Sequence, residues 1–310
     1  MKSIFPMCKY FTYSLACLAL CASTSDAATA DGQTFATPRD AVSALERALS
    51  AKDLNALRKI FGPGLTNLIN PDLVQATNEF RTVAAAVKET NRIVTAGEGR
   101  MILEYGSDVT PFPVPIVKDG ARWFFDTAAG TEELINRRIG RNELAVLDVV
   151  RAYVDAQREY ASSDRDDDQV LEYAQKFGST EGKKDGLYWP RDLDGTTSPL
   201  GPFVAEAQLA GYRKDPNQER TPFHGYYFKI LSRQGKHAPG GAYDYIINGN
   251  MISGFALVAW PAEYEETGIM TFIVNQQGRV YQKDLGAKTG KVASSMTTYD
   301  PDSTWTPSRD

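Results

Sequence analysis

An acidic segment in the middle of the chain has the residue types and spacing of a calcium-binding loop. Four carboxylates stand at positions 1, 3, 5 and 9 of such a loop, namely Asp164, Asp166, Asp168 and Glu172. Carboxylate oxygens are the hard ligands that Ca²⁺ prefers, and alternate loop positions can converge on one ion. The pattern is incomplete, because Gln169 replaces the usual glycine and Gln175 replaces the bidentate glutamate. Two interpretations follow, a weak calcium site or a solvated run of charge between helices.

The two histidines are the next groups with possible chemistry. His224 lies in a strand-like alternating run, and His237 lies in a turn of glycine, lysine and proline residues. A zinc site needs three or four nitrogen, sulfur or carboxylate ligands, and the cysteines Cys8, Cys17 and Cys21 all fall near the N-terminus. A Ser-His-Asp triad assembles in space, so spacing does not test it, but the sequence has no G-x-S-x-G nucleophile motif. We therefore expect satisfied or exposed histidines.

Tyr188 and Trp189 are the aromatic pair that we single out as a speculative ligand-binding site. They lie in a long stretch, residues 178–222, that is rich in Gly, Pro, Asp and Ser. Exposed tyrosine and tryptophan rings could stack on envelope sugars. The aromatic residues of the later strand-like runs are expected in the core, since aromatic side chains favour strands.

The elements that would position these residues form two successive α+β patterns. In the first, helices are predicted after the cap Thr37, from Asp53 and from Asn70-Pro71-Asp72, and strands over 100–105, 112–117 and 121–126. Asp119-Gly120 indicates a hairpin between the last two strands. This pattern predicts a small α+β domain over residues 31–130.

The second pattern has the same order on a larger scale, over residues 131–310. A short helix is expected from Thr131 to near Gly140, then a long one from Asn142, and a further helical stretch from Val170 to Phe177. Strands are predicted over 223–232, 243–247, 251–260, 269–275 and 279–285. Asn248-Gly249 is typical of a tight hairpin turn between neighbouring strands. We expect a long helix packed on an antiparallel meander.

The N-terminus has the pattern of a secretory signal peptide over residues 1–27. Lys2 and Lys9 precede an apolar run of eleven residues, 11–21, and Ser25-Asp26-Ala27 offers a cleavage site. Eleven residues are too few to span a bilayer, which needs about 20, so no transmembrane anchor is expected after cleavage. The cleaved chain would be free of cysteine, which suits an oxidising compartment. We expect a periplasmic or secreted protein.

The composition is that of a folded protein without nucleic-acid partners. The chain has 310 residues, of which 42% are hydrophobic, and its formal charge is −5. The aromatic and apolar content excludes a disordered chain. Binding to a nucleic-acid duplex normally requires a concentrated basic surface, and the sequence contains no such concentration of charge.

Seven runs of the chain resemble the bacterial family known as domain of unknown function 2950. The runs are Trp123–Gly130, Arg138–Glu143, Tyr153–Ala161, Ala238–Tyr245, Phe255–Pro261, Thr267–Asn275 and Val280–Gly286. The resemblance covers nearly all of the expected mature chain. It implies an exported bacterial protein of unassigned activity, and it carries over no catalytic residues.

Two fainter resemblances concern the folds of the two halves. A helix rich in Ala, Gln and Tyr, an acidic loop and the runs 225–228, 272–275 and 278–281 are similar to the soluble headgroups of pilin-like proteins. The first half is similar, in the order of its elements, to cystatin-like or NTF2-like domains. A whole predicted domain precedes the long helix, whereas a pilin starts with its apolar helix, so the resemblance implies the fold and not the filament.

The function expected from the sequence is an exported envelope protein that acts as a non-catalytic binding or structural module. Its partner would be another envelope component or a protein. The alternative is a periplasmic hydrolase that uses paired carboxylates, which can be recognised only from their separation in space.

Overall fold

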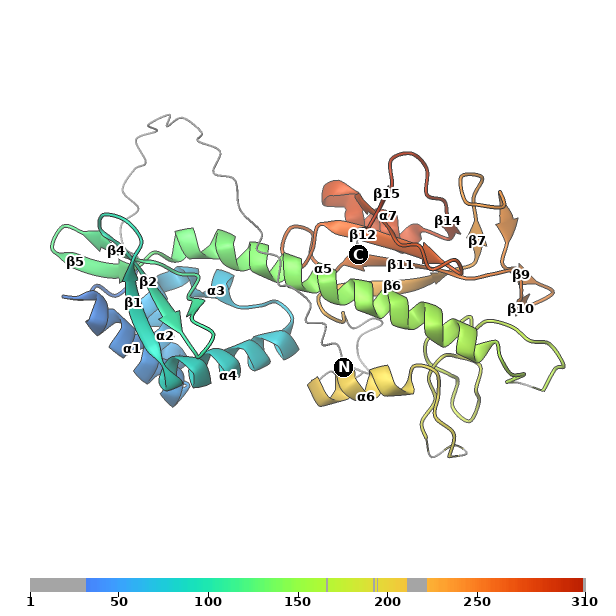
Figure 1. Cartoon of the computed structure of the whole chain (residues 1–310), viewed down its shortest axis with the longest axis horizontal. Helices are drawn as coiled ribbons and strands as arrows, with labels where there is room; N and C mark the ends of the chain where they lie inside the picture. Colours follow the sequence, from blue (N-terminus) through green and yellow to red (C-terminus); the bar gives the residue numbers. More distant parts are fainter. Residues whose placement is uncertain (1–31, 166, 192, 194, 211–221, 309–310) are drawn as a thin grey trace, which may run out of the picture.

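One long helix runs through both halves of the molecule and joins them. The computed structural model describes residues 32–165, 167–191, 193, 195–210 and 222–308. Helix α5 (Thr127–Tyr160) has 34 residues, so it is roughly 50 Å long at the standard rise per residue. The N-terminal lobe lies at one end of α5 and the C-terminal lobe along the rest of it (Figure 1). Helices and antiparallel sheets are both present, which confirms the α+β class.

Local capping signals begin the helices of the N-terminal lobe where the sequence predicts. The helices are α1 (Pro38–Ala51), α2 (Leu54–Phe61), α3 (Leu65–Leu68) and α4 (Leu73–Glu89), with the short turn η1 (Gly62–Gly64) between α2 and α3. Thr37 and Asp40 form a reciprocal capping box at the start of α1. Asp53 and Asp72 cap α2 and α4 by accepting hydrogen bonds from main-chain N–H groups of the first turn. These three predictions are confirmed.

The sheet of the N-terminal lobe contains a strand that the sequence pattern did not predict, β1 (Asn91–Thr95). The order of the sheet is β1, β2 (Arg100–Tyr105), β4 (Ile116–Asp119) and β5 (Arg122–Phe125), with β3 (Thr110–Pro111) paired to β2. The hairpin at Asp119-Gly120 is confirmed by the pairing of Asp119 with Arg122. The strand predicted over 112–117 begins only at Ile116, because Pro113 and Pro115 cannot donate a ladder hydrogen bond.

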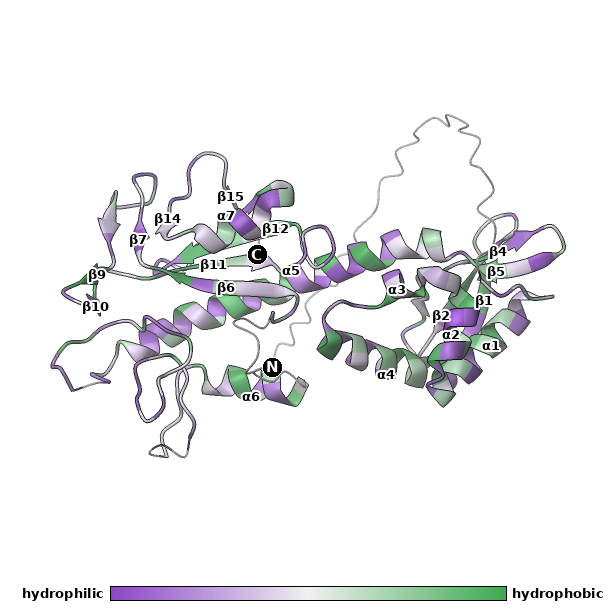
Figure 2. Cartoon of the chain, turned by 180° about the vertical axis from the view of Figure 1, so that it is seen from behind, coloured by the Kyte–Doolittle hydropathy of each residue, from purple (hydrophilic) through white to green (hydrophobic). Residues whose placement is uncertain are grey.

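The C-terminal lobe is built on a five-stranded antiparallel sheet in the order β15-β13-β12-β11-β6. Its strands are β6 (Tyr226–Leu231), β11 (Ala256–Pro261), β12 (Met270–Asn275), β13 (Tyr281–Asp284) and β15 (Thr306–Pro307). Every residue of β11 is buried, and α5 and α7 (Thr289–Ser295, after the turn η2, Gly286–Lys288) both contact this strand. Figure 2 shows the hydrophobic residues along β11 and in bands along α5. Together with α5, this sheet forms the core of the lobe.

Smaller elements complete the C-terminal lobe. A three-stranded sheet has the order β14 (Thr298–Tyr299), β7 (Arg233–Gln234) and β8 (Tyr243–Asp244), and helix α6 (Gly201–Ala210) precedes β6 in the chain. Strands β9 (Ile246–Ile247) and β10 (Asn250–Met251) form a hairpin around Asn248-Gly249, as predicted. Both turn residues have positive φ, 51° and 97°. The strand predicted over 251–260 is wrong in one respect, because Ser253 and Gly254 separate β10 from β11.

Three predictions about helices are wrong. Thr131 is not a cap, because α5 begins at Thr127 after the cap Asp126. The predicted break near Gly140 does not occur, and α5 is continuous. A glycine inside a helix costs only about 1 kcal/mol, and packing of α5 on both lobes exceeds that cost. The helix predicted over 170–177 is also missing, and Tyr173 instead pairs with Met251 in an isolated bridge. The side-chain amide of Gln157 accepts the N–H of Ala174 and donates to its C=O, each at 2.8 Å. Because these main-chain groups are bonded to Gln157, they do not form helical hydrogen bonds, and the segment is extended.

Within the part of the chain that is described, no helix combines the length and apolar character required to cross a membrane.

Candidate functional site

The carboxylates of the acidic segment accept hydrogen bonds from their own loop and from the neighbouring hairpin. Both carboxylate oxygens of Asp164 accept main-chain N–H groups, from Asp167 at 2.9 Å and Gln169 at 2.8 Å. Asp168 accepts the N–H of Val170 at 2.8 Å and the side-chain amide of Asn250 at 2.7 Å. These contacts hold the segment that follows α5 to β10.

The calcium hypothesis stays a prediction. Glu172 accepts the N–H of Met251 at 3.0 Å. Among the residues that the structure describes, no group of three or more His, Cys, Asp or Glu side chains gathers as metal ligands would. Asp166 lies outside the described residues.

Trp189 is part of the core of the C-terminal lobe and does not form an exposed platform. Its side chain is 1% exposed, and its indole N–H donates to the Thr196 hydroxyl at 3.3 Å. The cations of Arg165 and Lys184 lie 5.5 and 5.7 Å from its ring centre. The expectation of an exposed Trp189 ring is therefore wrong, because tertiary packing covers this segment. Tyr188 is half-buried, and its role in ligand binding stays a prediction.

The two histidines lie in different surroundings. His237 binds Asp300 twice, through its main-chain N–H at 2.8 Å and its ring Nδ1 at 3.0 Å. His224 has a left-handed backbone with φ of 49° and stacks edgewise on Phe223. Burial lowers the pKa of His224, and the carboxylates of Asp72 and Glu206 partly oppose this shift.

Buried polar side chains gather where α4, α5 and the C-terminal lobe meet. We call this set the junction, and its buried members are Asn70, Asp72, Arg138, Asn142 and Thr267. The Asn142 side chain accepts the Gln75 amide N–H at 3.0 Å and donates to the Thr267 carbonyl at 2.8 Å. One helix residue is thus bonded to both lobes.

Charged contacts extend the junction. Arg138 donates to the carbonyl of Ile69 at 3.3 Å, and Arg141 pairs with Glu79 at 2.6 Å. Burial lowers the pKa of Arg138, while Glu79 and Glu266 counteract the shift. Because its hydrogen bonds connect segments that are distant in the sequence, the junction fixes one lobe relative to the other.

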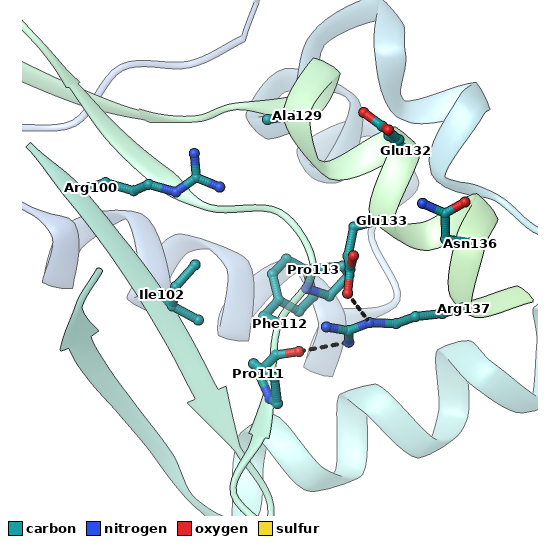
Figure 3. A pocket seen from close by; sticks show the side chains of 10 residues that line it. All are labelled: Arg100, Ile102, Pro111, Phe112, Pro113, Ala129, Glu132, Glu133, Asn136 and Arg137. Carbon is teal, nitrogen blue, oxygen red and sulfur yellow. Dashed lines mark hydrogen bonds and ion pairs between the residues drawn. The ribbon is translucent and has the colours of Figure 1, made fainter. Parts of the chain in front are cut away.

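A hollow of about 330 Å³ opens between the sheet of the N-terminal lobe and the first turns of α5 (Figure 3). Its sheet wall carries Arg100 and Ile102, which share one face of β2 because they are two residues apart. Its helix wall and its floor are lined by Ala129, Glu132, Glu133, Asn136 and Arg137, and by Pro111, Phe112 and Pro113. The helix residues recur at spacings of three and four and so lie on one face of α5.

Some polar side chains of the hollow are bonded to other residues of the protein, and others can bind a ligand. Arg137 is fixed, since it donates to Glu133 at 2.7 Å and to the carbonyl of Pro111 at 2.9 Å. Arg100, Glu132 and Asn136 are exposed, and no hydrogen bond or ion pair joins their side chains to other described residues. Figure 3 shows the Arg100 side chain extending from the strand toward α5. The hollow therefore presents a cation on one wall and a carboxylate and an amide on the other.

Sequence reasoning missed this hollow entirely. Its residues come from the strand at 100–102, the segment 111–113 and the helix face 129–137, none of which carries a catalytic or ligand-binding motif. The one local signal was the run Pro111-Phe112-Pro113, where β3 ends at Pro111 and Pro113 cannot donate a ladder hydrogen bond, so that an aromatic residue lies at the edge of the sheet.

The fold and the hollow define a two-lobed α+β protein with a hollow between the sheet of its N-terminal lobe and the first turns of α5. A family model described as protein of unknown function (DUF2950) matches residues 32–307, and the chain belongs to this family. Comparisons with curated proteins and with solved structures give no significant match. The cystatin-like and pilin-like resemblances of the two lobes therefore stay predictions.

Proposed function

We propose that this protein is exported to the bacterial envelope and binds another envelope component in the hollow of its N-terminal lobe, without catalysing a reaction. The observation that carries this proposal is the set of polar groups that have no partner among the described residues, Arg100, Glu132 and Asn136, above an apolar floor. Binding pockets usually combine apolar surface with polar groups that orient the ligand, and the hollow offers both. The signal-peptide pattern of residues 1–27 supports export.

The carboxylates of the hollow favour binding over the alternative of hydrolysis. A glycoside hydrolase of the paired-carboxylate type needs two carboxyl groups facing each other across the scissile bond. Glu132 and Glu133 are consecutive on α5 and line the same wall of the hollow, so they do not face each other across it. Glu133 is also bound to Arg137. Neither feature suits a general acid and base acting on one bond.

Cosedimentation with envelope fractions tests the proposal. Purified chain starting at Ala28 is mixed with isolated cell-wall sacculi and, separately, with membrane vesicles. Ala129 is exposed and lines the hollow, so Ala129→Trp should fill it and abolish sedimentation. Ala128→Trp is the matched control, since Ala128 is exposed on the neighbouring position of α5 and does not line the hollow.

Three outcomes are informative. Sedimentation that Ala129→Trp abolishes and Ala128→Trp preserves would support the proposal. Equal sedimentation of both variants would reject the hollow as the binding site, and wild-type protein that stays in the supernatant with every fraction would reject envelope binding. Export has its own test, because the mass of protein recovered from the periplasm or medium should correspond to a chain beginning at Ala28 or Asp31.

A further inference from the structure

Unlike charges line the two walls of the hollow without meeting each other. Arg100 projects from the first residue of β2, and Glu132 lies on the face of α5 that lines the opposite wall. No ion pair joins these two described residues, so their charged ends are more than 4 Å apart. A ligand that carries an anion at one end and a cation at the other could contact both walls at once.

The size and floor of the hollow limit the ligand further. A volume of about 330 Å³ is at the small end of the range of ligand pockets, which suits a molecule of two or three amino-acid residues. Pro111, Phe112 and Pro113 supply an apolar floor between the two charged walls, and Ile102 adds apolar surface beside Arg100. Small apolar side chains fit such a floor, and the amide of Asn136 can bond a peptide group.

We propose that the hollow binds a short peptide with a free ammonium group and a free carboxylate. Arg100 binds the carboxylate, Glu132 binds the ammonium group, and the floor contacts small side chains such as those of alanine. Arg137 keeps the helix wall in place through its bonds to Glu133 and Pro111. This inference rests on the proposed function and names the ligand class of the same site.

Three probes separate the contributions of the two charges. Trialanine carries both charges, N-acetyl-trialanine lacks the ammonium group, and trialanine amide lacks the carboxylate. Binding is measured by calorimetric titration of the chain starting at Ala28. Trialanine should bind about tenfold or more tightly than either blocked peptide, since hydrogen bonds to charged groups are stronger than neutral ones.

The variants assign each charge to its wall. Arg100→Gln should make trialanine and its amide bind equally while the preference over the acetylated peptide remains. Glu132→Gln should give the reverse pattern. Arg47→Gln is the control for net charge, because Arg47 is exposed on α1 and does not line the hollow. Thermal melting of each variant confirms that it is folded.

The results also distinguish failure of this inference from failure of the proposed function. Equal binding of the three peptides, or a uniform loss in both variants, would overturn the peptide assignment. If Ala129→Trp still abolishes envelope sedimentation in that case, the proposed function stands and the ligand is of another class. Trialanine should also displace the protein from sacculi, because both would occupy the hollow. Trialanine that binds in the hollow without displacing the protein would show that the envelope component is bound elsewhere and would reject the proposed function.

Discussion

Replacing Asn142 with leucine should destabilise the protein by about 2–4 kcal/mol, because it leaves buried polar groups without partners. The Asn142 side chain is 1% exposed and makes two hydrogen bonds, one to each lobe. Leucine has the same number and branching of side-chain heavy atoms, so the change removes the polar groups and leaves no cavity. The carbonyl of Thr267, a residue only 2% exposed, loses its partner, and a buried polar group without a partner costs about 1–3 kcal/mol. Gln75 is half-buried and keeps a weaker contact with Asp72 at 3.4 Å, so it should add about 1 kcal/mol.

Urea unfolding followed by tryptophan fluorescence measures this effect. Trp123 reports on the N-terminal lobe, and Trp260 is buried in the sheet of the C-terminal lobe. The control is Leu144→Asn, two residues along the same helix, where the side chain is 68% exposed and the change should stay within about 0.5 kcal/mol. In Asn142→Leu the unfolding transitions of the two lobes should also separate, because a bond between them is lost. A free energy of unfolding indistinguishable from that of wild type would refute the view that this residue couples the lobes.

Three further changes test local features. Gly249→Val should destabilise the C-terminal lobe by more than about 1 kcal/mol, because Gly249 has φ of 97° and valine is strained in that region. Gly290→Ala in α7 is the control and should be neutral. An unchanged urea midpoint for Gly249→Val would contradict this prediction. Millimolar Ca²⁺ should raise the melting temperature of wild type but not of Asp166→Ala, and equal melting in all conditions would leave only an acidic loop. Burial opposes the charged form of Asp185, but hydrogen bonds from Lys176 and Thr180 outweigh it and lower the pKa to about 2. The stabilisation from this carboxylate should thus be complete above about pH 4 and be lost as the pH falls toward 2, and an NMR titration midpoint near 4 for Asp185 would contradict the assignment.

The two lobes depend on α5 in different ways. In the N-terminal lobe its first turns supply one wall of the hollow, and in the C-terminal lobe it covers the central strands of the sheet. Glu143 accepts the N–H groups of Ile269 and Met270, each at 2.9 Å, next to the bond between Asn142 and Thr267. One continuous helix is thus hydrogen-bonded to the C-terminal lobe and also supplies a wall of the hollow.

Features that depend on a few neighbouring residues could be predicted from the sequence alone. Thr37 with Asp40, and Asp53, begin helices because their side chains satisfy N–H groups of the first turn. Asn248-Gly249 makes a hairpin because both residues tolerate positive φ. Such contacts are local, so their pattern is visible along the chain, and the family resemblance was visible in the same way.

The remaining features depend on contacts between distant segments, and they became visible only in the folded chain. Whether α5 breaks at Gly140 depends on packing that no local propensity records. The extended path of 170–177 follows from Gln157, and the burial of Trp189 follows from the segments packed over it. The hollow brings Arg100 and Glu132 together from a strand and a helix of different parts of the chain. Local spacing cannot show such a site, because the free energy that places its walls comes from the packing of whole elements.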